Sequence, residues 1–296
     1  MNLVRERMRF TKGHGTENDF VLVPCLDGQV DLDAERVSRI CDRRRGIGAD
    51  GIIAVVPTEC AQESAVRDMA GAAAWFMDYR NANGSIAEMC GNGSRVFAAY
   101  LRREGLETNT EFAIATRAGV KTVRIEGDLL ADGLVATNLG PWRLMNPAQA
   151  QSDGFDALVH IDDQDPLSAL SLDLGNPHTV VALPPSYRLD DVDLSTAPTV
   201  RPEPVHGTNV EIIHPLQPRH IAMRVYERGV GETRSCGTGA AAAALATSFW
   251  AGQHEPEGDW QVDVPGGSLR VRGLPGHEVE LAGPAVLVAD GEFTLP

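Results

Sequence analysis

Short apolar runs separated by polar, glycine-containing stretches dominate the chain, a pattern typical of strands joined by turns. Helical spacing appears over 32–41, after residue 90, and most strongly in the alanine-rich run 240–246. The predicted strands are 10–12, 20–23, 52–56, 73–79, 112–116, 120–125, 134–139, 169–174, 179–183, 208–213, 222–227, 261–264, 268–271, 279–281 and 285–288. We therefore expect a strand-rich protein with few helices.

Several connecting segments lack a regular period. Residues 13–19 predict a polar turn, and residues 57–72 predict a surface connection. Residues 141–166 are expected to be polar and irregular, and the proline-rich segment 184–206 to be a surface loop. The arginines at 43–45 are expected to form a solvated loop face.

Two Cys-Gly-x-Gly elements, about half the chain apart, each open a predicted helix. The first is Cys90-Gly91-Asn92-Gly93, and the second is Cys236-Gly237-Thr238-Gly239. At a helix start, free backbone N–H groups and the positive end of the dipole favour anions, which lowers the pKa of a thiol. Each cysteine is thus a candidate for acid–base chemistry.

The two halves also share an order of features: an asparagine before a strand, then a loop and strand, then a strand, the cysteine and its helix. Asn18-Asp19-Phe20 corresponds to Asn176-Pro177-His178, and residues 50–53 correspond to 209–213. This ordered repeat predicts a pseudo-twofold arrangement, with the two cysteines facing each other across a cleft.

Composition restricts the class of protein. Net charge is −15, with 26 basic and 41 acidic residues, which argues against binding to nucleic-acid backbones. The first ten residues lack a signal-peptide core, and no run is apolar enough to span a membrane, so we expect a cytoplasmic protein with no membrane partner. The five cysteines form neither a disulfide framework nor a zinc pattern, and Cys25, Cys41 and Cys60 are expected to be small buried residues.

Two thiols on opposite faces of one carbon suit inversion of a stereocentre. One thiolate removes the proton while the opposite thiol delivers another, and two helix N-termini stabilise the charge that develops on the substrate carboxylate. The pair works only if nearby groups split the two thiol pKa values.

At these residues the chain resembles the diaminopimelate epimerases, over nearly its whole length. The most specific stretches are residues 81–85 with 89–93, residues 175–178, and residues 225–229 with 232–233 and 235–239. The resemblance implies an α/β fold of the α+β type with two pseudo-symmetric domains, each a barrel-like strand-rich sheet around a central helix. The expected domains are residues 1–134 plus 283–296, carrying Cys90, and residues 135–282, carrying Cys236.

The resemblance also implies roles for individual residues. Cys90 and Cys236 would be the acid–base pair, and His178 and Glu227 would tune their pKa values. Substrate-binding residues would be Asn18, Asn81, Gly91, Asn92, Asn176, Asn209, Glu227, Arg228, Gly237 and Thr238. No metal, pyridoxal phosphate or nucleotide is expected, the partner is the small molecule diaminopimelate, and the chain is expected to form a homodimer.

The chain departs from the family at Gly51, where many members carry glutamine, and at Glu17, where glycine is usual. Three other functions remain alternatives. One is a two-cysteine proline racemase or hydroxyproline epimerase, against which Asn92 argues because those relatives usually carry histidine there. The others are a thiol redox protein and a phosphate or dinucleotide binder using residues 46–51, whose spacing fits neither standard motif.

Overall fold

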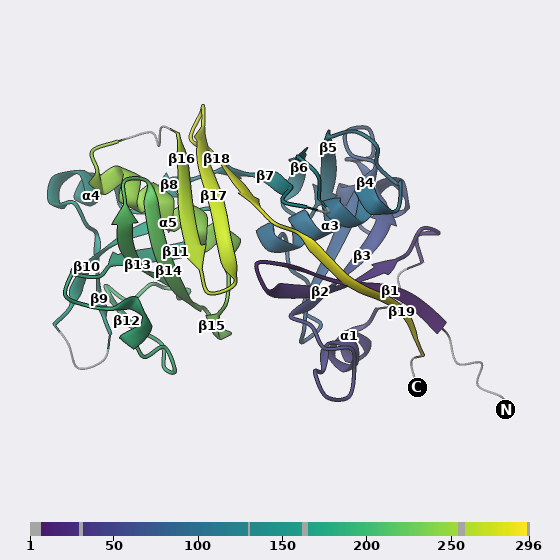
Figure 1. Ribbon diagram of the computed structural model, residues 1–296, viewed down its shortest axis with the longest axis horizontal. Helices are drawn as coiled ribbons and strands as arrows, with labels where there is room; N and C mark the ends of the chain where they lie inside the picture. Colours follow the sequence, from purple (N-terminus) through teal and green to yellow (C-terminus); the bar gives the residue numbers. More distant parts are fainter. Residues whose placement is uncertain (1–6, 30–31, 130, 162–164, 254–257, 295–296) are drawn as a thin grey trace. The chain divides into compact units, whose positions relative to one another are not determined.

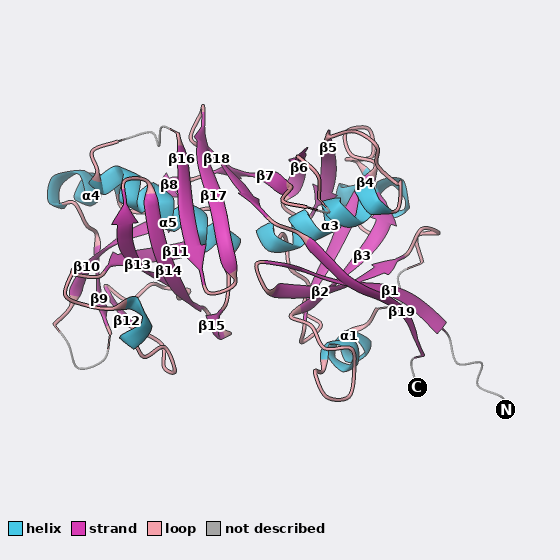
Figure 2. Cartoon of the chain, in the orientation of Figure 1, coloured by secondary structure: helices cyan, strands magenta, loops and turns pink. Residues whose placement is uncertain are grey.

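The computed structural model describes residues 7–29, 32–129, 131–161, 165–253 and 258–294, which are mainly strands with few helices (Figures 1 and 2). The expected strand-rich α+β class is thus confirmed. The chain divides into two compact units: unit 1 is Met1–Thr137 with Pro284–Pro296, and unit 2 is Asn138–Gly283.

Unit 1 is a sheet built around one central helix. Its strands pair in the order β19, β1, β2, β3, β4, β5, β6 and the first residues of β7, with β2–β3 and β4–β5 parallel. The strands are β1 (Arg7–Gly15), β2 (Asn18–Pro24), β3 (Gly51–Pro57), β4 (Trp75–Asn81), β5 (Glu111–Thr116), β6 (Gly119–Glu126), β7 (Leu134–Pro141) and β19 (Val286–Thr294). The helices are α1 (Ala34–Cys41), the short 3₁₀ helix η1 (Thr58–Cys60), α2 (Ser64–Arg67) and α3 (Gly91–Arg103).

Two apolar cores lie on opposite faces of the unit 1 strands. On one face, α3 is buried from Gly91 to Leu101 and packs against alternate residues such as Phe20 and Ile53. On the other face, α1 packs Val37 and Ile40 against the intervening strand residues. A strand buried on both faces reads as a continuous apolar run, which explains the sequence of β3.

Unit 2 is likewise a sheet around a helix. Its strands pair in the order β8, β10, β11, β13, β14, β16, β17 and β18, with β9 and β12 continuing from β10 and with β15 beside β14. The strands are β8 (Arg143–Leu144), β9 (Ala157–His160), β10 (Leu167–Asp173), β11 (Pro177–Ala182), β12 (Thr199–Arg201), β13 (Asn209–Gln217), β14 (His220–Glu227), β15 (Gly231–Thr233), β16 (Asp259–Val264), β17 (Gly267–Leu274) and β18 (Glu278–Gly283). The helices are α4 (Pro147–Asp153), the 3₁₀ helix η2 (Leu189–Asp191) and α5 (Gly237–Trp250).

The α5 helix is buried all around its circumference, as a helix enclosed by a sheet must be. Its alanines at 240–244 are fully buried, and their small side chains let the strands approach the helix closely. The same alanine run has the highest intrinsic helix propensity, so local preference and packing agree here.

The two units share one order of strand pairings. In unit 1 it is β1–β2 antiparallel, β2–β3 parallel, β3–β4 antiparallel and β4–β5 parallel. In unit 2 the same sequence is β10–β11, β11–β13, β13–β14 and β14–β16. Since Phe20 pairs with Gly51 and His178 pairs with Asn209, the repeat equates Phe20 with His178 and Gly51 with Asn209.

Some segments that the sequence predicts to be irregular are ordered. Residues 141–166 contain β8, α4 and β9, and residues 184–206 contain η2 and β12. Residues 57–72 contain η1 and α2. These elements are short and largely polar, so their sequences lack the apolar period on which the prediction depends.

The hairpin between β1 and β2 is tighter than predicted. Gly15 pairs with Asn18, so the turn is Thr16–Glu17 rather than the whole segment 13–19. Both turn residues have left-handed backbone angles, with φ of 50° at Thr16 and 62° at Glu17. A two-residue turn with positive φ at both positions is of type I′, a conformation that glycine adopts without strain and that a β-branched threonine adopts rarely. The backbone angle at Glu17 is thus one that favours glycine, in agreement with the glycine that the resemblance leads us to expect there.

We expect Glu17→Gly to stabilise the chain, by about 0.5–1 kcal/mol, because the replacement removes Cβ strain at a positive φ. Chemical denaturation measures the change. The matched control is Ser38→Gly in α1, an exposed helical position where glycine should lower the unfolding free energy by a similar amount. A destabilised Glu17→Gly protein would contradict the strain argument.

Candidate active site

Cys90 is the residue that caps the N-terminus of α3. Its backbone is extended, with φ −141° and ψ 118°, and its Sγ accepts a hydrogen bond from the Gly93 N–H at 3.4 Å. A side-chain acceptor at this position satisfies one of the free N–H groups of the first turn. The expectation that Cys90 lies at a helix start is therefore confirmed.

Asn18 and Asn92 lie beside the Cys90 sulfur. The Cys90 thiol is 3.8 Å from Asn18 Oδ1, and the same oxygen accepts from Asn92 Nδ2 at 3.2 Å. Asp50 orients this amide, because its carboxylate accepts from Asn18 Nδ2 at 2.8 Å and from the Asp19 N–H at 3.1 Å. Asn18 therefore presents its oxygen to the thiol and to the helix start.

A charged network behind Asn18 fixes Asp50 in place. Arg43 donates to Asp19 and to Asp50, each at 2.7 Å, and Lys12 also pairs with Asp19. Burial raises the pKa of Asp19, but the bonds from Arg43 and Lys12 outweigh it and hold that pKa below its usual value. Residues 43–45 are all exposed, so the predicted solvated loop face is confirmed, and Arg43 also holds Asp19 and Asp50 from this face.

Cys236 caps α5 in the same way as Cys90 caps α3. Its backbone has φ −122° and ψ 116°, and its Sγ accepts from the Gly239 N–H at 3.4 Å. The Thr238 hydroxyl lies 3.6 Å from the sulfur. Both helices therefore begin on a cysteine whose sulfur lies over free N–H groups, a geometry that favours negative charge at the sulfur and on a bound anion.

A chain of polar side chains leads from Thr238 into the interior of unit 2. Asn176 Nδ2 donates to Thr238 Oγ1 at 3.3 Å, and Asn176 Oδ1 lies 3.0 Å from His178 Nε2. His178 Nδ1 lies 2.7 Å from Glu211 Oε1, and both side chains are completely buried. Each ring nitrogen thus faces an oxygen acceptor, so the imidazole is held in one orientation.

Two carboxylates affect the pKa of the Cys236 thiol. Burial raises its pKa well above the ordinary thiol value, and the negative charges of Glu227 and Glu211 raise it further. The bonds from Thr238 and Gly239 act in the opposite direction but do not compensate. Cys236 is therefore a thiol at neutral pH.

We expect iodoacetamide to modify Cys236 with a pH midpoint well above the value of about 8.5 for a free thiol, because only the thiolate reacts. Below the shifted pKa, the rate of Cys236 alkylation should increase about tenfold for each pH unit. Peptide mass spectrometry follows this single site. Glu227→Gln is the informative variant, because loss of one negative charge should move the Cys236 midpoint to lower pH. A Cys236 midpoint at or below about 8.5 in the unaltered chain would contradict the electrostatic account.

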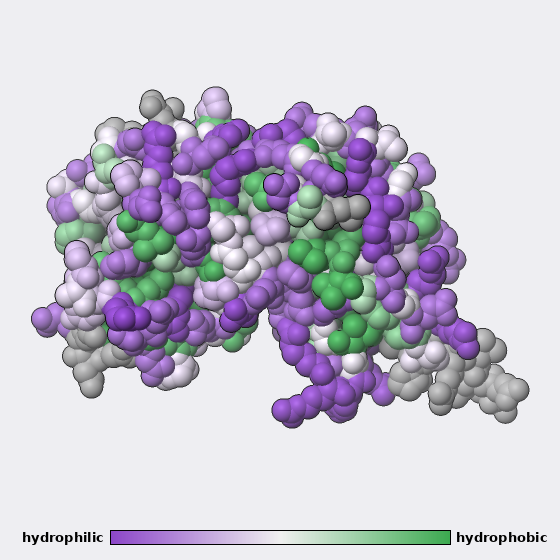
Figure 3. Space-filling view, in the orientation of Figure 1, coloured by the Kyte–Doolittle hydropathy of each residue, from purple (hydrophilic) through white to green (hydrophobic). Residues whose placement is uncertain are grey.

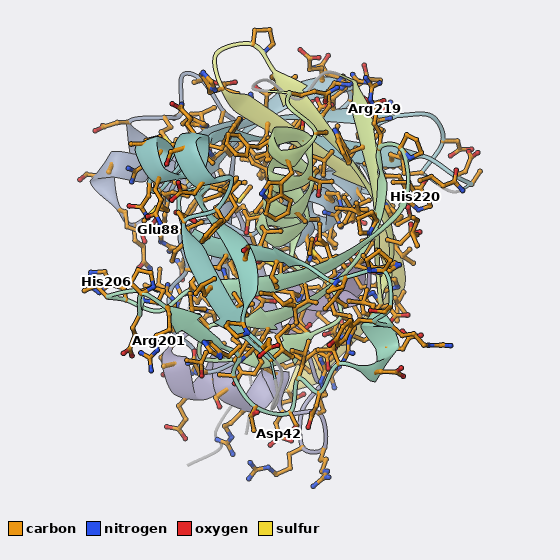
Figure 4. The ribbon with its side chains drawn as sticks, turned by 90° about the vertical axis from the view of Figure 1, so that its left-hand side faces the viewer. Asp42, Glu88, Arg201, His206, Arg219 and His220 are labelled. Carbon is orange, nitrogen blue, oxygen red and sulfur yellow. The ribbon has the colours of Figure 1, made fainter. Side chains whose placement is uncertain are left out.

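Glu227, Asn209 and Arg228 lie at the end of β14 and the start of β13. Glu227 Oε1 accepts from the Thr233 hydroxyl, and Asn209 Oδ1 accepts from the Arg228 N–H at 3.0 Å. The Arg228 guanidinium donates to the carbonyl of His206 at 2.6 Å, and His206 is labelled in Figure 4. Of the predicted residues of unit 2, Asn176, His178, Glu227, Gly237 and Thr238 thus lie at or are linked to the start of α5, while Asn209 and Arg228 contact each other.

Asn81 differs from the other predicted residues. Its amide accepts from the Tyr79 hydroxyl at 3.0 Å and donates to Ser85 Oγ at 2.9 Å, so it closes the turn that follows β4. These bonds stabilise the local turn and do not join Asn81 to Cys90. Its predicted contact with substrate stays a prediction.

Gly51 cannot carry a side chain in this fold. A Cβ there would lie 2.6 Å from the Arg80 carbonyl oxygen and 2.7 Å from a ring carbon of Tyr79. The glutamine that the resemblance leads us to expect at this position would need β3 and β4 to shift. Its absence here therefore follows from the packing of these two strands.

Gly51→Ala should lower the free energy of unfolding by about 1–3 kcal/mol, because backbone and ring must move to admit the methyl group. Gly71→Ala is the matched control, since a Cβ at Gly71 meets nothing within 4 Å. That control should be neutral or slightly stabilising. Equal effects of the two substitutions in urea denaturation would show that the clash is unimportant.

Three residues of these surroundings were missed by sequence reasoning: Asp50, Arg95 and Glu211. Glu211 lies in the apolar strand β13, and Arg95 lies in the buried part of α3; both are 0% exposed. A charged residue inside an apolar run is a detectable signal, since such groups are almost never buried without a partner. Asp50 follows a polar loop and offers no comparable signal.

The remaining cysteines were predicted to be small buried residues. Cys25 and Cys41 are buried, which confirms the prediction for both. Cys60 is exposed, so the prediction is wrong there; it lies in the surface helix η1. Within the described ranges, no helix is long and apolar enough to cross a membrane, and no group of three or more histidine, cysteine or acidic side chains is arranged to hold a metal ion.

Comparison with solved structures defines the fold class. The chain matches a Bacillus anthracis phenazine biosynthesis protein of the PhzF family with a TM-score of 0.68 and 16% identity, over 98% of this chain and 100% of that one. It matches a hydroxyproline epimerase from Agrobacterium vitis with a TM-score of 0.65 and 15% identity, over 100% of this chain and 94% of that one. At such identities the likeness shows the shared fold.

Sequence comparison is more specific. The family model for diaminopimelate epimerase matches residues 10–145 and 170–288. Diaminopimelate epimerases from Thermobifida fusca and Streptomyces coelicolor are 45% and 46% identical to this chain, over 97% of it and over 98% and 96% of their own lengths. That of Corynebacterium glutamicum is 44% identical over 97% of this chain and 98% of its own length. The chain therefore belongs to the diaminopimelate epimerase family.

Proposed function

We propose that this chain interconverts L,L-diaminopimelate and meso-diaminopimelate, a step of lysine and cell-wall precursor biosynthesis. Membership of the family supports the reaction, since relatives matched over nearly their whole length are named for it. The observation that carries the mechanism is that Cys90 and Cys236, each within its own unit, have the same local geometry, with the sulfur over the first turn of a buried helix.

In the proposed mechanism the two cysteines act from opposite sides of the substrate α-carbon. One thiolate takes the α-proton, the other thiol donates a proton to the opposite face, and the pair then exchanges roles in the reverse direction. The N–H groups at Gly91–Asn92 and Gly237–Thr238 bind the α-carboxylate, whose negative charge grows as the proton leaves. No metal, pyridoxal phosphate or nucleotide takes part in this scheme.

The surrounding polar residues hold the substrate and adjust the thiols. We assign Asn18, Asn81, Asn176, Asn209 and Arg228 to the amino and carboxylate groups of the substrate. His178 and Glu227 act on the protonation of Cys236, consistent with the effect of the Glu227 charge on this thiol. Closure of the site on the substrate would keep the carbanion away from water.

The test is conversion of L,L-diaminopimelate by the purified chain in buffer without added cofactor. We expect formation of the meso isomer until both isomers are present at equilibrium, and no turnover of proline or 4-hydroxyproline isomers. Turnover of a proline isomer with none of diaminopimelate would reject the assignment in favour of the related racemases.

We also propose that the chain acts in the cytoplasm as a homodimer. Figure 3 shows apolar surface on unit 1 where β19 crosses this face, and Val286 and Val288 of that strand are 42% and 58% exposed. Exposed apolar side chains close together on a strand suit contact with a second copy. Light scattering should give twice the chain mass, and Val288→Lys should shift it toward the monomer.

A further inference from the structure

Arg95 is a completely buried cation one turn into α3. Its guanidinium donates to three neutral oxygens: the Gly91 carbonyl at 3.3 Å, the Pro284 carbonyl at 3.3 Å and the Thr16 hydroxyl at 3.2 Å. Gly15 provides the space for the group, because a Cβ there would lie 2.9 Å from Arg95 Nη2. Unit 1 is thus shaped to hold a guanidinium directly behind the start of α3.

No carboxylate in the described part of the chain forms an ion pair with Arg95. The carboxylates on the strands packed against α3 already have cations: Asp19 pairs with Lys12 and Arg43, Asp78 with Arg80 and Arg117, Glu126 with Arg124, Asp290 with Arg103, and Glu292 with Arg7. The other cations or titratable bases on these elements are Arg9, His14, Arg102 and Lys121. A buried charge without an opposite charge is costly, so the position of Arg95 requires an anion from elsewhere.

The Cys90 thiol is the ionisable group that affects the pKa of Arg95. Burial lowers the pKa of Arg95 to about 10, and Cys90 acts in the opposite direction by favouring the charged guanidinium. At neutral pH Arg95 remains a cation. By reciprocity, a cation that is stabilised by the Cys90 thiolate stabilises that thiolate equally.

Unit 2 has the opposite charge behind its cysteine. The repeat equates Arg95 with Ala241, and equates Ile53 with Glu211, since Leu22 pairs with Ile53 as Val180 pairs with Glu211. A Cβ on Gly93 would meet Ile53 and Met77, whereas a Cβ on the equivalent Gly239 would meet Glu211 Oε1 at 2.7 Å. The Cys90 sulfur therefore has a buried cation near it, whereas the Cys236 sulfur has a buried carboxylate, that of Glu211.

We propose that Arg95 is the buried counter-cation of the Cys90 thiolate, and that it makes Cys90 the thiolate and Cys236 the thiol of the resting pair. This inference deepens the proposed epimerase function and rests on it. Arg95 is a positioning residue, because it touches neither reacting atom. In the resting state Cys90 is then the base that accepts the α-proton, and Cys236 is the acid that supplies one.

The test is the pH profile of Cys90 alkylation by iodoacetamide, read at the Cys90 peptide by mass spectrometry. The background is Cys60→Ser, which removes the exposed thiol. In that chain we expect a Cys90 midpoint below the free-thiol value of about 8.5 and below the midpoint of Cys236. Arg95→Met should raise the Cys90 midpoint by at least one unit, a loss of about tenfold or more in alkylation rate at pH 7. Arg95→Lys should recover most of the rate.

Arg103→Met is the matched control, because Arg103 lies on the same helix but pairs with Asp290. Its Cys90 profile should be unchanged. A folded Arg95→Met protein with the original profile overturns the inference. If that variant does not fold, a Cys90 midpoint at or above 8.5 in the Cys60→Ser chain overturns it as well.

The readout needs no turnover, so the two proposals fail separately. A chain that shows the Arg95-dependent profile but does not convert diaminopimelate rejects the proposed function. A chain that converts diaminopimelate with a profile independent of Arg95 rejects the role of Arg95.

Discussion

Cys90→Ala and Cys236→Ala should each abolish epimerisation, with losses of at least about 10³-fold in kcat. Each replacement removes one of the two groups that transfer a proton, and positioned acid–base groups typically contribute 10²–10⁴-fold each. Initial rates from both L,L- and meso-diaminopimelate measure the effect. The loss should appear in both directions, since each thiol acts in each direction.

Cys60→Ala is the matched control for the two cysteine variants, because Cys60 is an exposed cysteine in a surface 3₁₀ helix of unit 1. It should retain the full rate. Circular dichroism and the unfolding midpoint should show that both inactive variants are folded. If either alanine variant kept a tenth of the activity, its cysteine would not be an obligatory proton carrier.

Substitution of Glu211 should have the second largest effect, because it should lower both stability and activity. Glu211→Ile should lower the free energy of unfolding by about 3–5 kcal/mol, because it leaves His178 buried beside an apolar group that cannot accept its hydrogen bond. Activity should fall strongly, since His178 orients Asn176 and Asn176 donates to Thr238 next to Cys236. Glu211→Gln keeps an acceptor in place and should have a smaller effect on stability.

The repeat supplies the decisive control for Glu211. Unit 1 carries Phe20 and Ile53 where unit 2 carries His178 and Glu211, so the double variant His178→Phe with Glu211→Ile copies an apolar pair that this fold already accommodates. It should recover much of the stability lost in Glu211→Ile and remain inactive, because replacing a buried polar pair by apolar residues is often neutral for stability. A fully active double variant would show that His178 and Glu211 have only a structural role.

The helix starts at Cys90 and Cys236 were predictable because the sequence signal there is local. Glycine next to cysteine, followed by an apolar helical run, defines a helix N-terminus without knowledge of the rest of the fold. The alanine run after Cys236 strengthened the second assignment through its propensity. The ordered repeat was predictable for a related reason, since both halves place asparagine before a buried strand.

The buried charges were missed because their partners are distant in the sequence. Arg95 meets Thr16 and Pro284, and Glu211 meets His178, so their roles exist only once the strands are paired. Likewise, residues 7–15 form one nine-residue strand, but its full length is hard to recognise in the sequence because Gly13 and Gly15 resemble turn residues. Gly15 is instead required by the approach of the Arg95 guanidinium.

The most direct test of the two-thiol mechanism is the uptake of deuterium during the first few per cent of conversion of L,L-diaminopimelate in heavy water. We predict one deuterium at the inverted α-carbon of the meso product and almost none in the remaining substrate, because the proton is removed and replaced by different groups on opposite faces. Both cysteine-to-alanine variants should show no uptake in either pool. Deuterium entering product and substrate equally, or uptake that persists without Cys90 or Cys236, would contradict the mechanism.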